Sequence, residues 1–246
     1  MKASPQEQLR LLELAALDAE LGRLEHRRRG LPEHAEVERL DARAAELHDG
    51  IVTAETEVGD LTREQNKAEG DVEQVRARVD RDRKRLDAGQ VSSPRELENL
   101  QSEIGSLHRR QSDLEEIVLD VMERLEAVDN RLASLSAEQA RLGGERADAA
   151  ARRGAALTDI AARAGELGER RAGIAERVPA DVLGLYEKLR DQHGVGAAAL
   201  RRGRCEGCHL ALGTVDLNRI RAADPDEVLR CEECRRILVR TPESGL

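Results

Sequence analysis

The spacing of the apolar residues is the strongest constraint on how this chain can fold. Between residues 37 and 86, positions that step by three and four form one register, and 13 of its 15 positions are apolar. A second register over residues 97–142 has apolar residues at 12 of 14 positions. Runs of this length are typical of a coiled-coil seam, in which each apolar position faces a partner helix. The second register shifts near Gly143 and Gly144, as a four-residue insertion would cause, and resumes at Leu157.

The segment between the two runs, LDAGQVSSPREL, has the residues of a short turn between helices. Gly89 suits a helix C-terminus, while Ser93 and Glu96 form a Ser-x-x-Glu capping box around a proline in the first turn. A short connection makes two long helices antiparallel neighbours. We therefore predict a mainly α fold, in which residues 1–178 form a long antiparallel coiled-coil hairpin with its tip near residues 87–94.

The hairpin could be only a spacer, or its tip could be a contact surface. Each arm of about 80 residues would reach on the order of 120 Å, and Pro32 is expected to break the first arm opposite about Gly154 of the second. Residues 76–95 hold seven basic and three acidic residues, whereas the whole chain carries a net charge of −9. This local reversal of sign makes the tip cluster a candidate contact surface. The cluster consists of Arg81, Arg83, Lys84 and Arg85.

The composition argues against a large globular core. Tyr186 is the only aromatic residue, and 36% of the residues are charged, although aromatic rings usually supply much of a core's buried area.

Charged residues interrupt the N-terminal sequence, which therefore does not resemble a signal peptide, and no stretch approaches the roughly 18 apolar residues of a membrane span. We expect a soluble, cytoplasmic monomer. No Ser, His and acidic residues are placed as a nucleophile with its base, so we predict that the protein is not an enzyme.

All four cysteines lie near the C-terminus in two C-x2-C pairs, within RCEGCHLALG and RCEECRRILV. They are Cys205, Cys208, Cys231 and Cys234, with 22 residues between the pairs. Two such pairs can close a tetrahedron of thiolates around Zn²⁺, whereas disulfides are disfavoured in a reducing compartment. His209 is an alternative ligand, although four thiolates suffice. We predict one structural zinc ion, with no open coordination position, in a C4 zinc ribbon that follows a linker helix within residues 179–246.

Three segments of the chain resemble the bacterial C4-type zinc ribbon family that carries an N-terminal coiled-coil hairpin. They are VSSPRELENLQSEI at the tip, PADVLGLYEKLR at residues 179–190, and CEECRRIL at residues 231–238. The chain departs from the family where glycine often follows the second cysteine of each pair, because His209 and Arg235 stand there. The resemblance implies zinc binding by the four cysteines and a role in nucleic-acid binding or as an adaptor. Some relatives are linked to alternative sigma factors and flagellar gene expression.

Arginines flank both cysteine pairs and form the candidate contact surface of the ribbon. They are Arg201, Arg202 and Arg204 before the first pair, and Arg235, Arg236 and Arg240 after the second. Zinc would bring the two groups together, so our first hypothesis is phosphate contact with RNA or DNA. We expect weak, largely sequence-independent binding, because no aromatic ring near the cysteines could stack on a base. The alternative is an adaptor that links a protein at the hairpin tip to one at the ribbon, in the transcription or translation machinery.

Overall fold

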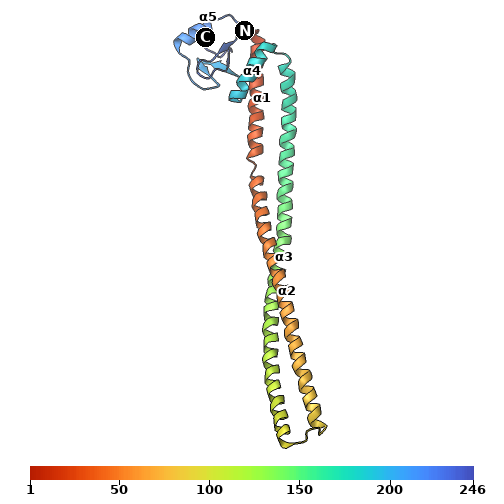
Figure 1. The fold of residues 1–246 in the computed structure, drawn as a ribbon. Coiled ribbons are helices and arrows are strands. Elements are labelled where there is room, and N and C mark those ends of the chain that lie inside the picture. Colours follow the sequence, from red (N-terminus) through yellow and green to blue (C-terminus); the bar gives the residue numbers. More distant parts are fainter. The chain divides into compact units, whose positions relative to one another are not determined.

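The structure, a computed structural model, describes residues 1–246 and contains five helices and four strands (Figure 1). By their internal contacts the residues form two compact units. The first, here called the hairpin unit, is Glu36–Ala149, and the second, the ribbon unit, combines Met1–Ala35 with Ala150–Leu246. None of the helices combines the length and the apolar character needed to cross a lipid bilayer.

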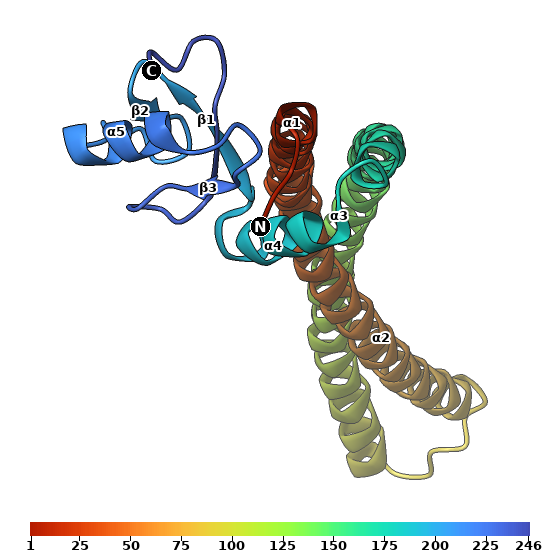
Figure 2. The same ribbon diagram turned by 90° about the horizontal axis from the view of Figure 1, so that it is seen from above.

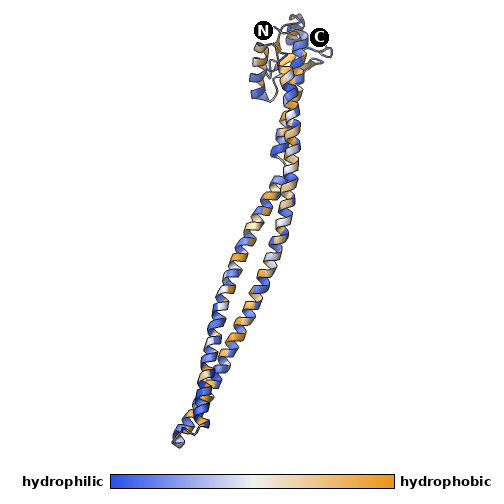
Figure 3. Ribbon diagram, turned by 90° about the vertical axis from the view of Figure 1, so that its right-hand side faces the viewer, coloured by the Kyte–Doolittle hydropathy of each residue, from blue (hydrophilic) through white to orange (hydrophobic).

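In the hairpin unit, α2 (Pro32–Asp87) packs along α3 (Pro94–Ala175) through the predicted seam. Apolar and polar residues alternate along both helices (Figure 3). The seam residues from the two helices that are buried together form two clusters. One contains Val37, Leu40, Leu47, Leu142 and Ala149, and the other contains Ala54, Leu61, Val121 and Val128. The mainly α fold with a long helical hairpin is therefore confirmed.

Two seam positions were predicted wrongly, since Leu97 and Gln139 are both exposed. Leu97 is 41% exposed, and the buried seam of α3 begins at Leu100. Leu97 lies in the first turn of α3, directly after the loop, and α2 has already ended at Asp87. Asp82 occupies a seam position as predicted and is buried, but its Oδ2 has no hydrogen-bond partner.

The turn at the tip follows the capping residues in the sequence. Gly89 has a φ of 63°, which a residue without a Cβ adopts at no steric cost. Ser93 Oγ accepts a hydrogen bond from the N–H of Glu96 at 3.2 Å. The Glu96 carboxylate in turn accepts from the N–H of Ser92 at 3.2 Å, one residue before the position expected in a capping box.

The predicted break in the first arm is present, because α1 (Pro5–Arg29) ends just before α2 begins at Pro32. The second arm has no matching break. Helix α3 continues through Gly143, Gly144 and Gly154, although glycine in a helix interior costs about 1 kcal/mol relative to alanine.

The ribbon unit is built on a small sheet with the strand order β2-β1-β4-β3. Its strands are β1 (Ala197–Arg201), β2 (Arg204–Cys205), β3 (Leu229–Arg230) and β4 (Ile237–Val239). Alternate residues of a strand face opposite sides of a sheet, and both sides are covered here. On one side, Ile237 packs with Leu14 of α1 and Tyr186 of α4 (Ala180–His193), and on the other, Leu238 packs with Ile220 of α5 (Thr214–Ala222) (Figure 2).

Helix α4 is fastened to α1 and α3 by a buried polar cluster. The carboxylate of Asp18 accepts hydrogen bonds from the Tyr186 hydroxyl and from Nε of Arg171, both at 2.6 Å. Arg171 also pairs with Glu187 at 2.6 Å. Because a buried carboxylate is tolerated only when it is paired, these contacts fix the position of α4. Burial, together with donation to Asp18, raises the pKa of Tyr186.

The first residues of the chain pair with the loop that precedes β3. The N–H of Ala3 donates to the carbonyl of Asp226 at 2.8 Å, and the N–H of Val228 donates to the carbonyl of Met1 at 3.3 Å. The side-chain amide of Gln8, which is buried, donates to the carbonyls of Ala3 and Pro225 at 2.9 and 3.1 Å. The ribbon is therefore held to the helices by segments from both ends of the chain.

Candidate metal centre

The four cysteine thiols converge on one point. Their sulfur atoms all lie within 4.8 Å of one another. The Sγ atoms of Cys205 and Cys234 are 3.8 Å apart, and those of Cys208 and Cys231 are 3.9 Å apart. Four Zn–S bonds of about 2.3 Å in a tetrahedron would place sulfurs about 3.8 Å apart. All four cysteines are free of disulfides, and their arrangement fits a tetrahedral zinc ion.

The two cysteine pairs sit in turns of the same geometry. In each, the N–H of the first cysteine donates to the carbonyl five residues later, and its carbonyl accepts from the N–H four residues later. These two distances are 3.0 and 2.7 Å in the first turn and 3.0 and 2.9 Å in the second. His209 and Arg235 have φ angles of 60° and 62°, the left-handed conformation that favours glycine. The departure from the family's glycines therefore leaves the turn geometry intact, at a cost of roughly 1–2 kcal/mol for each residue.

Without a metal, burial favours the protonated form of the thiols. Burial raises the pKa of Cys205 to about 12 and also raises the pKa of Cys231. Burial acts in the same direction on Cys234, but hydrogen bonds donated by the backbone and guanidinium of Arg236 bring its pKa to about 7. A metal must displace the remaining protons, so binding couples to thiol deprotonation. Four thiolates fill a tetrahedral zinc site, which makes it structural. His209 is exposed and does not belong to the group of converging side chains.

The cysteines are also part of a small apolar cluster that sequence reasoning missed. Cys205 and Cys231 are fully buried together with Leu200, Ile220 and Leu238. Much of this cluster depends on α5, a helix between the two cysteine pairs that was not predicted. Its signals were an acidic residue in the first turn and apolar residues three apart, at Leu217 and Ile220.

The structure places two of the six predicted contact arginines against the backbone of the ribbon. The guanidinium of Arg236 donates to three main-chain carbonyls, those of His193, Val195 and Gly207. That of Arg240 donates to four carbonyls at the end of α5 and in the next loop, those of Ile220, Ala223, Asp224 and Glu227. Both groups thus replace absent secondary-structure hydrogen bonds.

The other four arginines lie at the surface of the ribbon, but two of them are paired. Arg201 forms an ion pair with Glu243, and Arg235 forms one with Glu232. Arg202 and Arg204 are exposed and have no side-chain partner. They flank Gly203, the turn residue between β1 and β2, at which an added Cβ would lie 3.4 Å from Leu217 of α5.

At the hairpin tip most of the predicted cationic cluster is unpaired. Arg81, Lys84 and Arg85 are exposed and have no carboxylate partner. Arg83 lies 2.9 Å from Nε2 of His108.

Comparison with known proteins covers both units. The chain matches the CT398-like coiled coil hairpin domain over residues 14–194 and the C4-type zinc ribbon domain over residues 204–238. It is 37% identical over 243 residues to the uncharacterized protein Rv2229c of Mycobacterium tuberculosis, covering 98% of both chains. A solved structure from Mycobacterium smegmatis has a TM-score of 0.87 at 33% identity, covering 98% of this chain and 100% of the other. The structure of CT398 from Chlamydia trachomatis, with a TM-score of 0.73 and 19% identity over 96% of this chain and 98% of the other, shares the fold.

These matches agree with the geometry of the two units. The seam of α2 and α3 lies inside the matched hairpin domain, and the four converging thiols lie inside the matched zinc ribbon. The cysteines are the ligands of one structural zinc ion. The chain belongs to the family of proteins that join a CT398-like coiled coil hairpin domain to a C4-type zinc ribbon.

Proposed function

We propose that the ribbon unit binds nucleic acid through phosphate contacts made by Arg202 and Arg204. The observation that supports this proposal is how the six arginines around the cysteines are used. Two hold main-chain carbonyls and two pair with glutamates, so only Arg202 and Arg204 have a guanidinium without a partner. Arginines that project from a tight turn suit contact with a phosphate backbone, which needs charge and donors but no base-specific pocket.

The same surface limits the kind of binding. Glu206 and Glu233 are exposed within the cysteine turns, and aromatic rings for base stacking are lacking there. Binding is therefore weak, tolerant of sequence and sensitive to salt.

The test is the salt dependence of binding to a mixed-sequence, single-stranded oligonucleotide, followed by fluorescence anisotropy. The double variant Arg202→Gln/Arg204→Gln should flatten the plot of log affinity against log salt by about 0.7 per lost contact. The matched control is Arg201→Gln/Arg235→Gln, which removes the same charge from two ion-paired positions. An equal effect of both variants would assign binding to net charge alone, and absence of binding by the wild-type chain would refute the proposal. If neutralising Arg81, Lys84 and Arg85 alone weakened binding, the contact would lie at the tip.

A protein-binding ribbon is the second candidate function. Two apolar residues that follow the first cysteine pair in the chain are exposed, Val215 of α5 by 79% and Leu210 by 50%. An adaptor that bound a partner here would use them as the apolar centre of the contact. Crosslinked material recovered from lysate with and without nuclease treatment distinguishes the two candidates. A protein partner that survives nuclease treatment and is lost in Val215→Ser favours the adaptor.

A further inference from the structure

The hairpin unit carries an acidic band formed by residues 53–73 of α2 and 111–129 of α3. The first segment has seven acidic and two basic residues, and the second has seven acidic and one basic. Leu61 and Val121 belong to one buried cluster, which places the segments side by side. On α3, several acidic residues of the band have no cationic partner. They are Asp113, Glu116, Glu123, Glu126 and Asp129. The band is thus a region of uncompensated negative charge.

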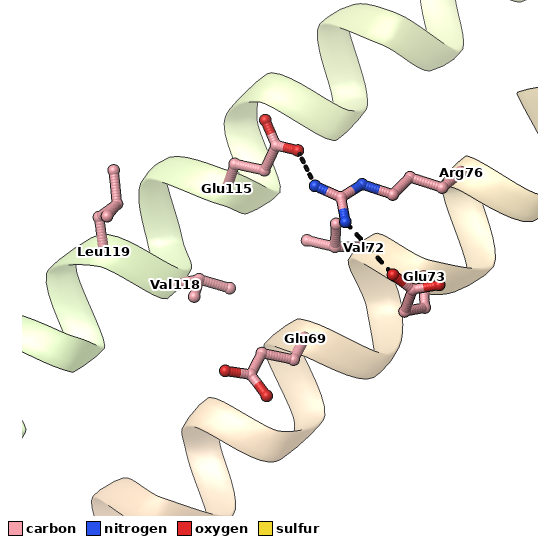
Figure 4. Close-up of a pocket in the computed structure, with 7 residues that line it drawn as sticks. All are labelled: Glu69, Val72, Glu73, Arg76, Glu115, Val118 and Leu119. Carbon is pink, nitrogen blue, oxygen red and sulfur yellow. Dashed lines mark hydrogen bonds and ion pairs between the residues drawn. The ribbon is translucent and has the colours of Figure 1, made fainter.

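A groove of about 480 Å³ lies between the two helices at one end of this band and extends to Arg76, just beyond it. It is lined by Glu69, Val72, Glu73, Arg76, Glu115, Val118 and Leu119 (Figure 4). The Arg76 guanidinium pairs with Glu115 at 2.7 Å and with Glu73 at 3.3 Å. One cation therefore serves two carboxylates, and Glu69 accepts a hydrogen bond only from the neutral amide of Gln65. The groove keeps a net negative charge.

The α3 wall of the groove is also apolar and open to solvent. Leu119 in this wall is 59% exposed, and Met122, one helical turn beyond the lining residues, is 46% exposed. At 3.6 residues per turn, Glu115, Leu119, Met122 and Glu126 follow one another along a single helix face. Singly exposed apolar residues are ordinary. Here, however, Leu119 follows Val118 of the groove wall and Met122 lies one turn further along α3, and Glu115 and Glu126 border the pair on either side.

We propose that this groove docks a basic amphipathic helix from a partner protein. The apolar face of that helix covers Leu119 and Met122, and its lysines or arginines meet Glu69 and Glu126. A third helix suits a groove between two helices, because it satisfies its own backbone and needs only side-chain complementarity. The negative charge repels phosphate backbones and opposes pairing of two copies through this band, since acidic side chains would then face each other. This surface lies in the hairpin unit and is independent of the function proposed for the ribbon unit.

The probe is a labelled helical peptide of about three heptads, with leucine at positions a and d and lysine elsewhere. Its comparison is a peptide of the same composition in shuffled order, which has no apolar stripe. Binding to the full chain is followed by fluorescence anisotropy. We expect the striped peptide to bind, more weakly as salt rises, and Leu119→Gln/Met122→Gln to lower its affinity about tenfold or more. The control is Ile117→Gln, a similarly exposed apolar residue outside the groove, which should leave affinity unchanged.

A second pair of variants separates the groove from net charge. Glu69→Gln/Glu126→Gln should weaken peptide binding several-fold. Asp71→Asn/Asp113→Asn removes the same charge outside the groove, and Asp71 lines a different hollow with Arg78 and Arg110. This control should have a much smaller effect.

Three outcomes would overturn the proposal. The first is that both peptides bind with equal affinity. The second is that the two charge variants lose the same amount of affinity for the striped peptide. The third is that the wild-type chain does not bind the peptide but self-associates in sedimentation, and that Leu119→Gln/Met122→Gln abolishes this self-association. The last outcome would assign the groove to a second copy. All variants change exposed or half-buried residues, and circular dichroism checks their fold. Oligonucleotide binding by the same variants should stay at the wild-type value, so failure here does not bear on the ribbon proposal.

Discussion

In the hairpin unit, arginines reach across to carboxylates of the facing helix, whereas in the ribbon unit two arginines reach inward to main-chain carbonyls. Arg43 pairs with Glu138 at 2.8 Å and Arg76 with Glu115 at 2.7 Å, and these exposed arginines meet half-buried glutamates. Arg236 and Arg240 donate to carbonyls of loops and helix ends. Arginine side chains thus form ion pairs at the surface of the hairpin unit, whereas in the ribbon unit two of them connect main-chain segments.

The difference follows from how each unit satisfies its backbone. A helix pairs nearly all its own N–H and C=O groups, so its side chains are needed only for the seam. The ribbon has strands of two to five residues, and most of its polar backbone lies in turns that need other partners. Stability is therefore spread along the hairpin seam and concentrated on a few groups in the ribbon. The following predictions test that contrast, from the largest expected effect to the smallest.

The largest effect should come from removing one zinc ligand. Cys231→Ser should release the metal and unfold the ribbon, because apparent zinc-binding free energies of about 10–16 kcal/mol in small zinc domains are folding free energies. Zinc content by mass spectrometry and far-UV circular dichroism are the measurements. Helicity should stay largely intact, since the hairpin seam does not involve the metal. A wild-type chain that contains no zinc under reducing conditions would contradict the assignment.

A charge in the seam should be the most damaging single change to the hairpin. Leu61→Asp should cost about 3–5 kcal/mol, because it removes a buried side chain and buries an unpaired carboxylate. Hydrogen exchange measures the loss around α2 and α3, and the ribbon amides should keep their protection. The control is Thr62→Asp at the neighbouring exposed position. Similar protection in both variants would show that residue 61 does not face the partner helix.

Paired substitutions of arginine compare the two units directly. Arg240→Gln should destabilise the ribbon by about 2–3 kcal/mol, since it leaves carbonyls at the end of α5 without a donor. Arg124→Gln, which breaks exposed ion pairs with Glu64 and Asp120, should cost less than about 1 kcal/mol. The rate at which a chromogenic chelator removes zinc should rise in the first variant only. Equal rates of zinc removal in the two variants would mean that Arg240 contributes little to the stability of the ribbon.

The smallest expected effect is a gain of stability. Asp82→Leu should stabilise the end of the hairpin by about 1 kcal/mol, because it replaces a buried carboxylate oxygen that has no partner with an apolar group. Slower hydrogen exchange near the end of α2 would confirm this, with the exposed Asp80→Asn as control. A faster exchange in Asp82→Leu would show that the carboxylate has a stabilising role at the tip.

The parts predicted from sequence are those set by local spacing. Steps of three and four place Leu61 and Val121 in a seam, and two C-x2-C pairs give four thiolates that can converge, wherever the rest of the chain lies. The contacts of Arg236 and Arg240 join residues up to 43 apart, and only the finished fold brings them together. The same holds for the Asp18 carboxylate. Its partner Tyr186 is 168 residues away, and no local pattern marks the pair.

The packing of α1 has a consequence for how the protein is made. Leu11 and Leu14 of α1 are covered by α4 and by Ile237 and Val239 of the last strand. The packing of the first helix to be synthesised is therefore complete only when the last strand has been made. At about 5–20 residues per second, the interval between Leu14 and Ile237 is roughly 10–45 s. During that time the arms of the hairpin can pair, whereas the apolar face of α1 lacks the part of its cover that Ile237 and Val239 supply. A nascent chain stalled before Ile237 should therefore expose that face and engage ribosome-associated chaperones, and release of the complete chain should end this engagement.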